Sequence, residues 1–164
     1  MQTLDNRTAR LMNFAGFAMA QAIALTATGG KPCVALAESK GERGFVGPFK
    51  GSLDDAVTTA RTTLAAIPEL GFSALAFAAE ISLGEETANG IVVEAAHPGA
   101  LDVPVVVIQL YREEADPAGY AVLGSVMLPE VPDEDRAAAM AEAVMEGARE
   151  NQEAFGHWMK KLEE

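Results

Sequence analysis

Residues 103–112 read VPVVVIQLYR and decide the class of fold that the chain can adopt. Positions 105–108 are all β-branched, and β-branched residues favour strands over helices. An unbroken apolar run of this length indicates a central strand covered on both faces. We therefore expect an inner strand of a sheet at 103–112, and interpret the rest of the chain around it.

Further strands are expected before and after this segment, at 72–83, 91–96 and 120–128. The connections between them are short, which favours antiparallel neighbours, because a parallel pair needs a long crossover. Earlier in the chain, residues 31–49 predict a β-hairpin. Pro48 in its second arm indicates an edge strand, since proline cannot donate a hydrogen bond to a neighbouring strand.

The N-terminal segment, from about residue 5 to 28, is expected to form an apolar helix. It has no charged residue between 11 and 30, so a membrane span and an export signal are alternatives. Asn13 and Gln21 count against a membrane span, and Asp5 counts against the basic start of a signal peptide. A helix that is apolar on most sides is buried in a core or against a partner. We expect no membrane association.

A long C-terminal helix is predicted from about 133 to 162. Its apolar positions recur in steps of four and three and form a seam with one polar member. A straight helix of about 43 Å exceeds the width of a compact domain of this size, so it either breaks, with Gly147 and Gly156 as candidate points, or projects. A projecting seam needs a partner, and a second copy of the chain is the simplest one. The candidate interface residues are Val144, Asn151, Phe155, Trp158 and Leu162.

These elements predict a single α+β domain over residues 1–164. A third helix, which Ser52 opens, lies between the hairpin and the later strands. The expected order is α-β-β-α-β-β-β-β-α, with an antiparallel sheet of about five or six strands and three helices gathered on one face. A chain of this length buries about 68–70% of its unfolded surface, so it needs no metal or disulfide to fold.

The charge is strongly acidic and unevenly placed. With 24 acids and 12 bases, the net charge is −12, which counts against nucleic-acid binding. Residues 1–51 hold six bases and three acids, whereas residues 52–128 hold two bases and eleven acids. The acidic body counts against a large anionic partner. The single cysteine, Cys33, cannot form an internal disulfide, which favours a reducing compartment, and we expect a cytoplasmic protein.

No motif in the sequence specifies a reaction, a metal or a cofactor, and none is expected. The glycines lack the spacing of a phosphate-binding loop, and the two histidines lie too far apart in sequence to suggest a zinc site. His97 is the best candidate for chemistry, because a histidine beside carboxylates can act as a general base. Glu94 and Glu80 lie on neighbouring predicted strands and could share a face near it.

Arg112 is the remaining candidate for a binding residue. It stands at the end of its predicted strand, directly before Glu113 and Glu114. It either pairs with these acids or binds an anionic ligand.

Two classes of function remain open. The first is a non-catalytic acidic interaction protein, a homodimer that acts like a chaperone by holding a partner segment on its sheet edge or in a helix groove. Small secretion chaperones are similar in size, charge and outer helices, although their strand order differs and no motif is shared. The second is an enzyme or small-ligand binder with a site around His97, Glu94 and Glu80. The absence of a catalytic motif favours the first.

Overall fold

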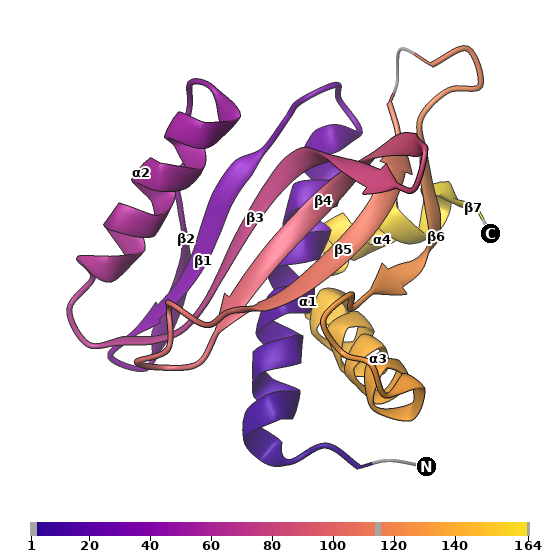
Figure 1. Cartoon of the computed structure of the whole chain (residues 1–164). Coiled ribbons are helices and arrows are strands. Elements are labelled where there is room, and N and C mark those ends of the chain that lie inside the picture. The colour runs from indigo at the N-terminus through magenta and orange to yellow at the C-terminus, as the bar shows by residue number, and fades with distance from the viewer. Residues whose placement is uncertain (1–2, 114–115, 164) are drawn as a thin grey trace.

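The computed structural model describes residues 3–113 and 116–163 and confirms the α+β class. Within these ranges the chain forms four helices and a seven-stranded sheet in the order β2-β1-β3-β4-β5-β6-β7 (Figure 1). The helices are α1 (Asn6–Thr26), α2 (Leu53–Ala65), α3 (Glu134–Glu150) and α4 (Gln152–Lys161). The strands are β1 (Cys33–Ser39), β2 (Glu42–Val46), β3 (Leu70–Leu83), β4 (Glu86–Ala96), β5 (Val105–Arg112), β6 (Ala121–Met127) and β7 (Leu162–Glu163).

The sheet is antiparallel from β2 to β6, as the short connections predict. Only β7, two residues long, runs parallel to its neighbour β6. The order of helices and strands agrees with the expected one up to α3. The difference lies in the C-terminal helix, which is two helices and not one.

The predicted helix at 133–162 breaks at Asn151 and does not project. The backbone of Asn151 leaves the helical region, with φ −93° and ψ 70°. Its side-chain amide donates to the carbonyl oxygen of Phe17 at 3.3 Å and to Oε1 of Gln21 at 3.2 Å, both on α1. The break therefore turns the chain so that α3 and α4 both pack against α1, and neither candidate glycine is the break point.

Helices α1 and α3 cross in direct backbone contact. A Cβ atom added to Gly16 would overlap the carbonyl oxygen of Val144, and one added to Gly147 would overlap the backbone of Asn13. Only glycine leaves room for two helix backbones to approach in this way. The crossing presses α1 between α3 and the sheet, where most of its apolar side chains are buried.

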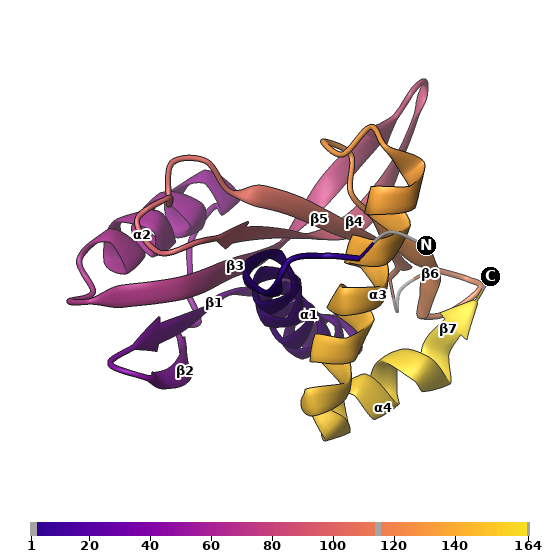
Figure 2. The ribbon, with the colours of Figure 1, turned by 90° about the horizontal axis from the view of Figure 1, so that it is seen from below.

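The helices cover the two faces of the sheet unequally. Helices α1, α3 and α4 lie on one face and enclose the main core, whereas α2 lies alone on the other face (Figure 2). The expectation that all helices gather on one face is therefore wrong for α2. Its buried stripe, which includes Val57, Ala60 and Leu64, packs on the side chains of β1 and β3 that point away from the main core.

The apolar seam of the C-terminal helix, which predicted a homodimer, packs against other parts of the same chain. Val144 is fully buried and Trp158 is 1% exposed. Asn151 bonds to α1, and the half-buried Phe155 contacts Trp158 with 6.3 Å between ring centres. Leu162 begins β7 beside β6. Except for Leu162, which is 37% exposed, the seam packs against α1 and the sheet within one chain, so its apolar side chains do not require a second copy.

The expected inner strand at 103–112 is β5, between β4 and β6. Val107 and Tyr111 face the main core. Gln109 lies between them, 1% exposed, opposite a bulge in β6. Its amide nitrogen donates to the carbonyl oxygens of Leu123 and Gly124 at 3.0 and 3.3 Å. The side chain thus ties β5 to the backbone of β6 where the register shifts.

We predict that Gly147→Ala destabilises the protein by about 1–3 kcal/mol, the usual cost of overpacking. The added methyl group would push α3 away from α1. Equilibrium urea unfolding measures the change in the free energy of unfolding. Gly156→Ala is the matched control, because a Cβ there meets nothing within 4 Å; it should be neutral or gain up to about 1 kcal/mol. Equal effects of the two substitutions would contradict the close crossing.

Candidate functional site

Strands β4 and β5 have no helix over their α2-side face, because α2 packs on β1 and β3 (Figures 1 and 2). The β5 side chains on this face are half-buried and belong to neither core cluster. The prediction of a strand covered on both faces is therefore right for one face only. We call this uncovered surface the open face. It consists of the half-buried side chains of Ala79, Ile81, Val92, Val106, Ile108 and Leu110. Ala79 and Val92 form its border, because they also pack against the α2-side core.

A glycine makes the open face continuous across its three strands. Gly90 on β4 lies between Ile81 on β3 and Ile108 on β5. A Cβ added to Gly90 would come within 2.7 Å of Cγ1 of Ile81 and 3.4 Å of Cγ2 of Ile108. The side chains of the two isoleucines thus occupy the space above Gly90, and the apolar surface continues across β4.

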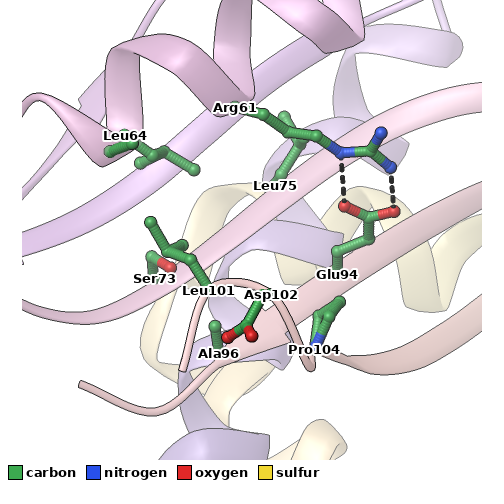
Figure 3. Close-up of a pocket in the computed structure, with 10 residues that line it drawn as sticks. Arg61, Leu64, Ser73, Leu75, Glu94, Ala96, Leu101, Asp102 and Pro104 are labelled. Carbon is green, nitrogen blue, oxygen red and sulfur yellow. Dashed lines mark hydrogen bonds and ion pairs between the residues drawn. The ribbon is translucent and has the colours of Figure 1, made fainter. Parts of the chain in front are cut away.

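A pocket opens beside the open face, between α2, β3, β4 and the loop that follows β4 (Figure 3). Its volume is about 210 Å³. A dry cavity of about 150 Å³ can hold benzene, so this pocket has room for one large apolar side chain. We call it the α2 pocket. Its apolar lining comes from Leu64, Ala65, Leu75, Ala96, Leu101 and Pro104.

An ion pair forms one wall of the α2 pocket. Nε of Arg61 on α2 donates to Oε1 of Glu94 on β4 at 3.1 Å, and a second guanidinium nitrogen donates to Oε2 at 2.5 Å (Figure 3). The Glu94 side chain is only 17% exposed, and a carboxylate among apolar side chains needs such a partner. The Glu94 carboxylate also raises the pKa of Arg61. The pair therefore fixes the edge of α2 against the open face.

The structure does not bring Glu80 and Glu94 together. The register pairs Leu75 with Glu94 and Glu80 with Asn89. Because side chains alternate along a strand, this register places the two carboxylates on opposite faces of the sheet. The expectation that they share a face is therefore wrong.

His97 lies on the covered side of the sheet, away from Glu94. Its ring centre is 5.8 Å from that of Phe72, which belongs to the main core. Its Nδ1 atom is buried without a hydrogen-bond partner. Burial and, to a lesser extent, the positive charge of Arg7 lower the pKa of His97, against a smaller opposite effect of Asp5. Within the described residues, no carboxylate accepts a hydrogen bond from Nδ1 of His97 to orient it as a general base.

Arg112 holds the β5–β6 turn. Its Nε donates to the carbonyl oxygen of Gly119 at 2.7 Å, and a terminal nitrogen donates to that of Ala118 at 3.4 Å. Glu114, one of its two predicted acidic partners, lies outside the described residues.

Cys33 is buried, and burial raises the pKa of its thiol, so that it stays protonated and unreactive.

Two kinds of feature are absent from residues 3–113 and 116–163. No group of three histidine, cysteine or acidic side chains there is placed to hold a metal ion. No helix in these ranges combines the length and apolarity that a membrane crossing requires.

The prediction from sequence missed the open face, the α2 pocket and the role of Arg61. The sequence did contain a signal that Arg61 has a special role. It is one of two bases in residues 52–128, which hold eleven acids, and it directly follows Ala60 of the buried α2 stripe. Leu101 and Pro104 carried no such signal, because only the folded loop brings them to α2.

Comparisons with protein-family models, with curated proteins and with solved structures gave no match for this chain.

We predict that His97 makes the protein less stable in mild acid. Its lowered pKa means that the unfolded chain binds the proton more readily than the folded one. The free energy of unfolding should therefore fall as the pH drops below about 6.5. Urea unfolding from about pH 7.5 to about pH 5 measures this slope.

His97→Gln should reduce this slope, whereas His157→Gln, at an exposed position on α4, should leave it unchanged. If the slope persists in His97→Gln, the decline has another source.

Proposed function

We propose that the protein is a non-catalytic interaction module that holds a segment of a partner protein on the open face. One observation carries this proposal: β5 is apolar on both sides, but only one side is covered. A sheet face that meets solvent normally carries polar residues. Contiguous exposed apolar surface on a globular protein marks an interaction site.

The α2 pocket supports the same proposal. Leu75 and Glu94 in its lining stand directly beside the open face. Protein interfaces draw much of their binding energy from a few large side chains that fill such pockets. A ligand on the open face could therefore be anchored by one side chain in the α2 pocket.

The alternative, an enzyme or small-ligand site around His97, Glu94 and Glu80, gains no support from the geometry. His97 and Glu94 lie on opposite sides of the sheet, and Glu94 is engaged by Arg61. This geometry therefore favours the interaction module.

The homodimer stays a prediction, which no observation tests. If the chain does self-associate, the open face is the better surface, because the seam of α3 and α4 is buried against α1. Sedimentation equilibrium of the unmodified protein and of Ile108→Lys distinguishes the cases, since a dimer through the open face should dissociate on that substitution.

We predict that a photoreactive benzoylphenylalanine at position 108 of the full chain forms one adduct of defined mass in the cells that produce the protein. The same group at position 138, exposed on α3, is the control and should form no such adduct. The adduct should disappear when Val92→Lys introduces a charge into the open face, because a bound apolar segment cannot solvate it. Unfolding midpoints verify that the variants are folded.

Adducts of equal yield at 108 and 138, or an adduct at 108 that survives Val92→Lys, would contradict the proposed function.

A further inference from the structure

We infer that the occupant of the open face is a basic amphipathic helix of a partner protein, anchored by one large apolar side chain in the α2 pocket. This inference rests on the proposed function and adds the chemistry of the partner. Three features carry it: the width of the open face, the charge around it, and the position of the pocket.

The width of the open face fits one helix. Neighbouring strands lie about 4.8 Å apart, so β4 and β5 together offer a strip about 10 Å wide. A helix with its side chains is about 10–12 Å in diameter. On one side of the strip α2 already lies on β1 and β3. On the far side, the β3–β4 hairpin curves toward the same face as α2 (Figure 2). A second helix beside α2 would fill the vacant place on the sheet.

The charge around the open face favours a basic occupant. The segment 52–128, which builds α2 and the strands β3 to β6, has eleven acids and two bases. Although Glu80 lies on the opposite face, the exposed Glu86 of β4 and the exposed Asp102 lie on the side of the open face. Both bases are engaged, Arg61 by Glu94 and Arg112 by the carbonyl oxygens of the β5–β6 turn. Complementary charge steers association and selects the partner. Lysine or arginine on the flanks of a bound helix would meet this acidic surround.

The α2 pocket specifies where the anchor enters. It lies at the α2 side of the strip, so the anchoring side chain must project from the edge of the bound helix that faces α2. Asp102 is exposed at the pocket and could meet a basic residue next to the anchor.

A second copy of the chain fits this description poorly. Each copy has a net charge of −12, so two acidic faces would repel. Helix α1 is largely buried, and the solvent side of α3 carries Glu142 and Glu146. Self-association is therefore an alternative outcome of the test and not the inference.

The probe is a fluorescently labelled peptide of about 14 residues, with leucine at helical spacing on one face and lysine elsewhere. Two peptides serve as comparisons: one with glutamate in place of every lysine, and one with the same lysines and leucines in a scrambled order. Fluorescence anisotropy at about 150 mM salt measures binding to the full chain. We expect the lysine helix to bind about tenfold or more tightly than either comparison peptide.

Two pairs of variants locate the binding. Ile108→Lys should weaken it about tenfold, whereas Leu53→Lys, at a residue 43% exposed at the start of α2, should change it by less than about twofold. Ala65→Met should fill the α2 pocket and weaken binding, whereas Ala66→Met, next to it and outside the lining, should not. Both alanines are exposed, so both variants are expected to fold.

Each other outcome overturns the inference in a recognisable way. If the glutamate helix binds equally well and still depends on Ile108, the open face binds a partner but does not select a basic one. If the scrambled peptide binds equally well, the attraction is unspecific charge. If no peptide binds and sedimentation shows a dimer that Ile108→Lys dissociates, the occupant is a second copy. If no peptide binds, the chain is monomeric and position 108 forms no adduct, the proposed function fails as well.

Discussion

The backbone contact between α1 and α3 at Gly16 and Gly147 is the constraint on which the rest of the structure depends. It keeps α1 packed between α3 and the sheet. Helix α1 therefore contacts both the sheet and the C-terminal helices, and all of them share a single core. The turn at Asn151 then brings α4 back onto α1 and buries Trp158. Because three of the four described helices are committed to this face, only α2 is left for the other.

The open face follows from that unequal distribution. Helix α2 covers β1 and β3, and the Arg61–Glu94 pair fixes its edge at β4. Fully burying a valine or isoleucine side chain contributes about 1.5–3 kcal/mol, and the half-buried Val106 and Ile108 realise only part of this within the chain. A partner that covers them gains the remainder. The same strand therefore supports the fold through one face and presents a binding surface on the other.

Local patterns in the sequence were sufficient for most elements. The apolar helix before Gly29, the hairpin at 31–49 and β5 were all predicted near their observed positions, because each depends on neighbouring residues. The second arm is an edge strand as predicted, but it ends at Val46, so Pro48 follows the strand and is not part of it. Asn151 was recognised as the polar member of a seam, but its role as the break depends on Phe17 and Gln21, far away in sequence. The candidate site was harder to predict from the sequence than the helices and strands. Whether Glu80 and Glu94 share a face depends on strand register, and whether Ile108 is covered depends on where α2 packs.

The most direct test of the open face is a chemical-shift map of the 15N-labelled full chain with the lysine–leucine helix bound. The largest amide shifts should fall on β4, on β5 and around Leu64 and Leu101 at the α2 pocket, while α4 should stay unchanged. Shifts concentrated on α3 and α4, or spread evenly over the acidic surface, would contradict a binding surface at the uncovered side of β4 and β5.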